Sequence, residues 1–338
     1  MAILHTSIVL GFTPTLPLPA AASRTHSQLR RPPSMSADPP SDASASSSRR
    51  LFLAESSALP LVLLTSLIAP PGARAAADGS SSLGEEFRSQ LGPVEPGWVR
   101  LVLCRHGQTD YNKERLIQGR RINAPINDEG VRQATALAGV LEGMDVRAVV
   151  SSSMMRAGQT ADIVHSRHRD VPRLRFKDLD EVDFGELEGR GIASGLPSLT
   201  STYASWRLGE GEARLGSIGE SGIDIATRVR AAIDDLIVVA KQPPMLASRL
   251  GIDVSAAFAS QADQQPPVVV AVAHGEFLRR LLADAAGDDV GLRLSAETAV
   301  INNCGINVVD VNPATLQTKI QLINWNSHIK RLEDIAKQ

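Results

Sequence analysis

Hydrophobic residues along this chain occur in two kinds of block. Short uninterrupted apolar runs have the length of buried strands, and longer stretches with apolar residues every three or four positions have the period of helices. Strands are predicted over 99–104, 146–150, 268–273, 306–311 and 318–323, and helices over 128–142, 156–165, 222–240 and 276–286. This alternation predicts an α/β fold, a three-layer α/β/α sandwich with a mostly parallel sheet.

Two of the predicted helices carry start signals. Asn127 is placed to cap the first helix, and Gly143 is placed to end it. Ser221 and Asp224 form a capping-box-like start for the third helix. The predicted apolar face of the first helix comprises Val131, Ala134, Leu137, Ala138 and Leu141.

The start of the chain has a different composition from the rest. It is rich in Ser and Pro, has no acidic residue before Asp38, and has no lysine before Lys113. A Ser-rich stretch with arginines and few acids is typical of an organelle transit peptide. Arg49 and Arg50 follow as a twin-arginine pattern, so a second targeting signal is predicted behind the first.

The second signal continues with an apolar run over 58–69, which is shorter than the roughly 20 residues that span a bilayer. Ala73-Arg74-Ala75 offers a cleavage site. We therefore predict a removable bipartite presequence over 1–75, which indicates a chloroplast protein of the thylakoid lumen. A disordered tail with a chance apolar patch and a mitochondrial presequence are the alternatives. A linker over 76–97 and one domain over 98–330 would follow, with an insertion loop over 241–267.

Composition narrows the function classes. Hydrophobic residues make up 43% of the chain and charged residues 21%, which is typical of a globular protein. The net charge of −2 gives no sign of a nucleic-acid-binding surface. Cys104 and Cys304 are expected to be buried free thiols, with a disulfide as the alternative.

The candidate chemistry lies where predicted strands end. The first strand is followed by Arg105 and His106, the second by three serines and then Arg156, and the third by His274. In open α/β sheets ligands bind beyond the carboxyl ends of the strands. Arginine forks suit phosphate oxygens, and histidine can act as a nucleophile or proton donor. A glycine after each histidine allows a sharp turn that brings N–H groups near an anion, so the pattern predicts a phosphoryl group as ligand.

At these residues the sequence resembles the histidine phosphatase superfamily, the phosphoglycerate mutase-like proteins, over roughly residues 99–330. The resemblance rests on several segments in family order: Leu103 to Asn112 with its Arg105-His106-Gly107 core, Gln118-Gly119, Ser151 to Ala161 around Arg156, Leu179 to Gly189, Gly219-Glu220-Ser221, and Ala273-His274-Gly275. The predicted domain over 98–330 is thus expected to be a histidine phosphatase domain.

The resemblance implies a phosphomonoester hydrolase that works through a phosphohistidine. His106 is the expected nucleophile and Glu181 the expected proton donor and acceptor, and Arg105, Arg156 and His274 are expected to hold the phosphoryl oxygens. The expected substrate contacts are Gly107, Gln108, Thr109, Asn112, Gln118, Gly119 and Gly275. Since protein groups spread the charge, the resemblance implies no metal and no cofactor. The expected partner is a small phosphorylated metabolite, with no nucleic acid and no membrane contact in the mature form.

Several alternatives stay open at this stage. Either histidine can be a buried core residue, Arg156 a helix-start residue, and Glu181 part of a solvated acidic run. True mutases carry an E-R-x-Y-G motif followed by a lysine. Here Val182 replaces the arginine, and Ile192 stands where the lysine would fall, which favours a phosphatase over a mutase. A catalytically silent phosphate-binding module is the remaining alternative.

Substrate specificity is expected to come from the Gly- and Ser-rich stretch 190–219, which is predicted to be irregular. Its Tyr203, Trp206 and Arg207 are the candidate wall residues, with the insertion loop 241–267 as a further candidate.

Overall fold

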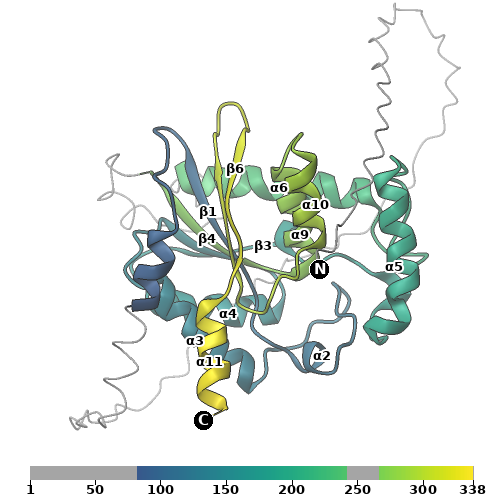
Figure 1. Cartoon of the computed structure of the whole chain (residues 1–338), viewed down its shortest axis with the longest axis horizontal. Coiled ribbons are helices and arrows are strands. Elements are labelled where there is room, and N and C mark those ends of the chain that lie inside the picture. Colours follow the sequence, from purple (N-terminus) through teal and green to yellow (C-terminus); the bar gives the residue numbers. More distant parts are fainter. Residues whose placement is uncertain (1–81, 242–265, 338) are drawn as a thin grey trace, which may run out of the picture. The chain divides into compact units, whose positions relative to one another are not determined.

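The computed structural model describes residues 82–241 and 266–337. The predicted presequence and most of the predicted insertion loop lie outside these residues. One six-stranded sheet forms the centre, with strand order β3-β2-β4-β1-β5-β6 (Figure 1). The strands are β1 (Val99–Arg105), β2 (Ala148–Ser152), β3 (Arg173–Phe176), β4 (Val268–Ala273), β5 (Ile306–Val311) and β6 (Thr318–Trp325).

The sheet is mostly parallel, as predicted. β1 pairs in parallel with β4, β4 with β2, and β2 with β3, whereas β5 and β6 add an antiparallel edge. The carboxyl ends of β1, β4 and β2 therefore lie side by side. The polar residues that follow these three strands in the sequence are therefore brought to the same edge of the sheet.

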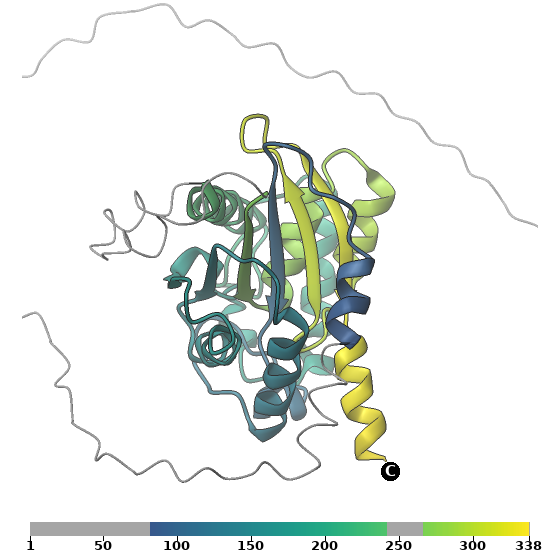
Figure 2. The same ribbon diagram turned by 90° about the vertical axis from the view of Figure 1, so that its left-hand side faces the viewer.

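Helices cover both faces of the sheet (Figures 1 and 2). Successive residues of β1 belong to two different apolar clusters: Leu101 and Leu103 to one, Val102 and Cys104 to the other. This two-faced burial explains why the strands are continuously apolar. The cluster with Leu101 and Leu103 contains residues from four helices: α5 (Ile192–Arg207), α6 (Gly222–Lys241), α9 (Gly275–Ala285) and α10 (Val290–Thr298). The cluster with Val102 and Cys104 contains residues from three: α3 (Asp128–Leu141), α4 (Met155–His165) and α11 (Ser327–Ala336). The three-layer sandwich is thus confirmed.

The predicted helix starts are confirmed, with one error on α3. The Asn127 side chain accepts a hydrogen bond from the Gly130 N–H, and Gly143 adopts a φ of +78° just beyond the helix. Ser221 and Asp224 cap α6 reciprocally. Val131, however, is 44% exposed, because the buried face of α3 is rotated towards Gln133 and Val140.

The expectation that residues 190–219 are irregular is wrong for their first half, where α5 runs from Ile192 to Arg207. Glycines and serines hid a helical period in which Leu199, Tyr203 and Trp206 face the core. α2 (Asp110–Lys113), β3 and α10 were not predicted either, and the 3₁₀ turns Lys177–Leu179 and Gly185–Leu187 flank the acidic segment.

The domain extends beyond both predicted boundaries. Residues 82–89, placed in the predicted linker, are helical, and Phe87 is fully buried with its ring 5.1 Å from that of Trp325. This helix lies next to the start of α11, which continues to Ala336 (Figure 2). None of the helices in the described ranges has the length and apolar character needed to cross a membrane.

Candidate active site

The ends of β1 and β4 bring two histidines onto one arginine. Arg156, in the first turn of α4, shares its Nε–H between His106 Nε2 at 3.2 Å and His274 Nδ1 at 3.1 Å. The two imidazole rings lie 5.1 Å apart, and all three side chains are buried. The structure thus brings together three of the five residues expected to be catalytic in one solvent-shielded cluster.

The hydrogen bonds assign a tautomer to each histidine. A guanidinium N–H can only donate, so the ring nitrogen that faces Arg156 carries a lone pair. His106 Nδ1 lies 2.8 Å from the Gly107 carbonyl and therefore holds the ring proton. Burial, followed by the charge of Arg156, lowers the pKa of both His106 and His274 well below the ordinary value. Both imidazoles are neutral at neutral pH.

His274 has a relay behind it that the sequence analysis missed. Its Nε2–H points to Ser152 Oγ at 2.8 Å, and that hydroxyl donates to Asp180 Oδ1 at 2.8 Å. Asp180 also accepts from the Ser153 N–H and hydroxyl. The serines at the end of β2 were visible as a polar strand end, but nothing in the sequence paired them with Asp180.

Two buried donors in this region have no partner among the described atoms, Arg105 Nε and Gln118 Nε2. Arg105 donates through another nitrogen to the Ile301 carbonyl at 2.7 Å, and Gly119, which follows Gln118, accepts from Arg156. Since buried polar groups are nearly always satisfied, these two donors are candidates to bind an acceptor such as a phosphate oxygen. Burial lowers the pKa of Arg156 to about 10, so this arginine remains a cation.

The carboxylate of Glu181 lies at the N-terminus of α9, the helix that begins directly after His274. Its Oε1 accepts the Phe277 N–H at 2.9 Å and the Val182 N–H at 3.0 Å, whereas Oε2 has only the Glu276 N–H at 3.3 Å. Burial raises the pKa of this carboxyl, and Arg156 opposes the rise. Oε2 is thus the more weakly held of the two carboxylate oxygens. Because its pKa is raised, the carboxyl is easier to protonate than a solvated glutamate.

The loop after His106 is held against α3. A Cβ on Gly107 would lie 2.5 Å from the Gly130 carbonyl oxygen, so only glycine fits. The Gly107 N–H donates to Thr160 Oγ1, and the Gln108 N–H donates to Gln133 Oε1. These backbone groups are therefore occupied within the protein, in contrast to the expectation that they point at an anion.

The other expected substrate contacts surround this loop. Thr109 caps α2 and donates its hydroxyl to Gln118 Oε1, and Asn112 accepts from the Thr109 N–H. Asn303, which the sequence analysis missed, donates to both the His106 carbonyl and Asn112 Oδ1 at 3.0 Å. The separation of 191 positions between Asn112 and Asn303 explains why no local pattern revealed it.

Gly275 opens α9 beside Arg105. A Cβ at this position would lie 3.3 Å from Arg105 Nε, so glycine leaves the guanidinium room to pass. Cys104 and Cys304 are buried free thiols whose pKa burial raises, as expected of core cysteines. Within residues 82–241 and 266–337, no three His, Cys, Asp or Glu side chains are grouped to hold a metal ion.

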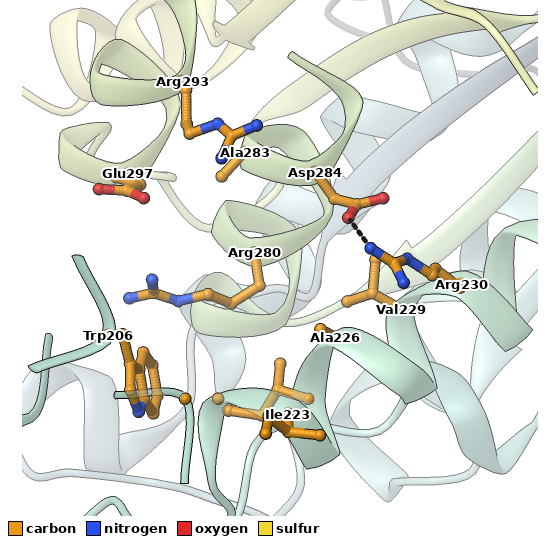
Figure 3. A pocket seen from close by; sticks show the side chains of 13 residues that line it. Trp206, Ile223, Ala226, Val229, Arg230, Arg280, Ala283, Asp284, Arg293 and Glu297 are labelled. Atoms are coloured by element: carbon orange, nitrogen blue, oxygen red, sulfur yellow. Dashed lines mark ion pairs between the residues drawn. The ribbon is translucent and has the colours of Figure 1, made fainter. Parts of the chain in front are cut away.

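A cavity of about 330 Å³ lies between α5, α6, α9 and α10 (Figure 3). Trp206 and Arg280 line it, and Arg230 forms an ion pair with Asp284 at 3.6 Å on its far side. Arg280 lies over the rings of Tyr203 and Trp206 at 4.5 and 4.9 Å. Two of the three expected wall residues, Tyr203 and Trp206, thus pack against the guanidinium of Arg280.

The third expected wall residue, Arg207, forms an ion pair with Glu297 at 2.9 Å. Arg280 itself is bonded to Glu276, the residue that follows Gly275. The aromatic pair is therefore linked to the start of α9 through one charged pair.

Comparison with known proteins places this fold and site in one family. The sequence model of the histidine phosphatase superfamily (branch 1) matches residues 101–326. The chain therefore belongs to the histidine phosphatase superfamily. The match contains all the residues that carried the resemblance in the sequence, from Leu103 to Gly275.

Relatives include both mutases and phosphatases. The chain is 29% identical to the "Probable phosphoglycerate mutase GpmB" of Proteus mirabilis over 70% of this chain and 97% of that protein. It is 33% identical to the "Glucosyl-3-phosphoglycerate phosphatase" of Mycobacterium tuberculosis over 54% of this chain and 74% of that one. These homologues support an enzyme with phosphatase or mutase activity.

Solved structures show the same fold. A native mycobacterial glucosyl-3-phosphoglycerate phosphatase, 25% identical, superimposes with a TM-score of 0.52 over 68% of this chain and 100% of that chain. A phosphoglycerate mutase from Bacillus anthracis, 20% identical, gives the same TM-score over 70% of this chain and 96% of that chain. The fold is thus phosphoglycerate mutase-like.

Proposed function

We propose that the protein is a phosphomonoester hydrolase that forms a phosphohistidine on His106. The observation that carries this proposal is the tautomer of His106. Its Nδ1–H is held by the Gly107 carbonyl, so the lone pair on Nε2 faces Arg156 and His274 inside the buried cluster. A neutral imidazole that presents a lone pair to fixed positive charge is suited to attack phosphorus.

The charge of the transferring group is met by protein groups. Phosphoryl transfer places negative charge on three equatorial oxygens, which need donors in place beforehand. Arg156 and Arg105 supply cations, and the unpartnered nitrogens Arg105 Nε and Gln118 Nε2 supply free donors. An entering phosphate would displace the hydrogen bond between Arg156 and His106. We therefore expect turnover without an added metal ion or cofactor.

Glu181 balances the protons in both steps. As His106 Nε2 bonds to phosphorus, the P–O bond to the alcohol breaks, and the leaving oxygen takes the proton from Glu181 Oε2. Water then attacks the phosphohistidine, gives its proton back to Glu181, and releases phosphate and neutral His106. A buried carboxyl with a raised pKa is suited to this exchange.

A phosphatase is favoured over a mutase by the residues that would bind a glycerate carboxylate. Val182 and Ile192 replace the arginine and lysine of the mutase motif, and Ile192 is 42% exposed at the start of α5. An apolar side chain there offers nothing to a carboxylate. A silent phosphate-binding module is disfavoured because the histidines, arginines and acid are all retained.

The substrate class is proposed to be a small phosphorylated metabolite. The cluster around His106 is buried, which suits a compact phosphate ester, and α5 with Tyr203 and Trp206 is the proposed specificity wall. Localisation in the thylakoid lumen remains a proposal that rests on the sequence of residues 1–75.

One panel of phosphomonoesters tests the function. The chain from Ala76 onward should release phosphate from p-nitrophenyl phosphate or sugar phosphates in the presence of EDTA. In the same panel, 3-phosphoglycerate is assayed for its 2-phospho isomer. Isomer formation faster than phosphate release would favour the mutase, and binding without turnover on every ester would favour the silent module.

A further inference from the structure

The segment that carries Glu181 is held by arginines through its main chain. Arg228 in α6 donates Nη1 to two carbonyls of this segment, Asp178 at 3.0 Å and Asp180 at 2.6 Å. Arg120 donates Nε to the carbonyl of Glu181 itself at 3.2 Å. The main chain on either side of the proposed acid is therefore fixed by side chains from two distant parts of the sequence.

Glu220 joins these arginines to the end of the same segment. Its Oε1 accepts from Arg228 Nε at 3.0 Å and from Arg120 Nη2 at 3.2 Å. Its Oε2 accepts from Arg228 Nη2 at 2.9 Å and from the Asp183 N–H at 2.8 Å. Both carboxylate oxygens are thus fully used, and a planar guanidinium faces them in a two-bond fork.

The residues around Glu220 are closely packed. The Glu220 N–H donates to the Asp183 carbonyl at 2.8 Å, and a Cβ on Gly219 would lie 2.4 Å from that carbonyl oxygen. The side chains of Glu220 and Arg228 are only 13% and 10% exposed. An ion pair with so little solvent keeps its geometry far better than a surface pair.

Arg228 also reaches the other side of the acid. Its guanidinium lies 5.0 Å from the centre of the Phe277 ring, and the Phe277 N–H is one of the two donors to Glu181 Oε1. Arg228 therefore contacts both the segment that carries Glu181 and the helix end that receives its carboxylate.

We propose that Glu220 and Arg228, with Arg120, are positioning residues that aim Glu181 at the leaving oxygen. Among the described residues, the hydrogen bonds of these three side chains to the segment that carries Glu181 end on main-chain groups and not on its carboxylate. This inference rests on the proposed function, because it assigns a role in a reaction that uses Glu181 as acid. A misplacement of about 1 Å in a catalytic group can cost on the order of 10²-fold in rate.

The leaving group distinguishes a positioning role from a structural one. An alkoxide needs a proton as it leaves phosphorus, whereas p-nitrophenolate is a stable anion that leaves without one. Loosening the acid should therefore slow transfer from an alkyl phosphate and spare transfer from the nitrophenyl ester. Damage to the histidine cluster or to the fold would slow both.

The test measures phosphoenzyme formation in a single turnover, trapped with an alkaline quench, from glycerol 2-phosphate and from p-nitrophenyl phosphate. For Glu220→Gln and Arg228→Lys, we expect a loss of about 10²-fold with the glycerol ester and less than about threefold with the nitrophenyl ester. The double variant should lose no more than either single variant, because the two residues act as one unit. Arg167→Lys is the control: it alters an exposed ion pair with Glu142, which has no contact with the Glu220 cluster, and should leave both rates unchanged.

Two outcomes would overturn parts of this account separately. If the wild-type protein forms no phosphoenzyme from either ester, the proposed function fails. If the wild-type protein does form it and Glu220→Gln slows both esters equally, or neither, the proposed function stands and the positioning role is wrong. A Glu220→Asp variant, which keeps the charge and shortens the reach, covers the case in which Glu220→Gln does not fold.

Discussion

The ends of β1 and β4 carry the same dipeptide, His-Gly, yet the structure uses them in opposite ways. His106 accepts a hydrogen bond from Arg156 at Nε2 and donates its Nδ1–H to the main-chain carbonyl of the next residue. His274 accepts from the same guanidinium at Nδ1 and donates its Nε2–H to Ser152, whose hydroxyl donates to Asp180. The two rings are thus reversed with respect to one shared arginine.

This difference separates two tasks that the sequence alone leaves equivalent. A nucleophile needs a lone pair and a ring that cannot turn, and a short main-chain bond gives His106 both. A group that stabilises charge gains from a relay ending in a carboxylate, because the relay supports the ring as it becomes cationic. The comparison therefore supports the proposal that His106 attacks phosphorus and that His274 stabilises charge.

The largest effect should come from the nucleophile. His106→Ala removes the attacking nitrogen, and we expect turnover to fall by on the order of 10⁴-fold or more, as when nucleophiles of other hydrolases are deleted. Steady-state hydrolysis of p-nitrophenyl phosphate measures it. Activity that persists in this variant would exclude His106 as the nucleophile.

A smaller loss is expected at the partner histidine. His274→Gln removes one stabilising group but leaves the lone pair of His106 in place, so the rate should fall by about 10²–10³-fold. A phosphoenzyme should still form on His106, only more slowly. A variant that loses the phosphoenzyme altogether would reverse the two assignments.

The relay behind His274 should contribute a weaker effect. Ser152→Ala leaves the buried Nε2–H without an acceptor, which costs roughly 1–3 kcal/mol. Where the lower end of this cost falls on the transition state, kcat should drop about fivefold. Ser151→Ala is the neighbouring control, since its hydroxyl contacts Arg173 and the Ser152 carbonyl but not His274. Equal kcat values for the two serine variants would show that the relay has no role in turnover.

Stability should depend on pH through both imidazoles. The folded pKa of each lies below the unfolded value of about 6.5, so neither histidine contributes above that pH. Below it the unfolded chain binds protons that the folded protein does not, and stability falls by about 1.4 kcal/mol per pH unit for each histidine. Urea denaturation between pH 6.5 and 5 should thus give His274→Gln a shallower loss than the wild type. Parallel slopes would mean that His274 is protonated in the folded state.

Much of this molecule could be predicted from local pattern. Continuous apolar runs identified β1 and β4, the capping residues Asn127 and Ser221 fixed two helix starts, and polar strand ends located the histidines. These features succeed because they depend on neighbours in sequence or on the parallel pairing of adjacent strands.

The parts that sequence missed depend on distant partners. The contacts of Ser152 with Asp180 and of Asn303 with His106 join segments that share no periodicity. α5 was missed because its glycines and serines masked three core contacts. Val131 was misplaced because a helical period fixes which residues share a face but not which of two adjacent stripes is buried.

The proposed mechanism requires that one particular nitrogen carries the phosphoryl group. The wild-type protein is mixed briefly with p-nitrophenyl phosphate and quenched in alkali, and the phosphohistidine is located by peptide sequencing and by its ³¹P chemical shift. We predict a single modified residue, His106, phosphorylated on Nε2. Phosphate on His106 Nδ1, or on His274, would contradict the account.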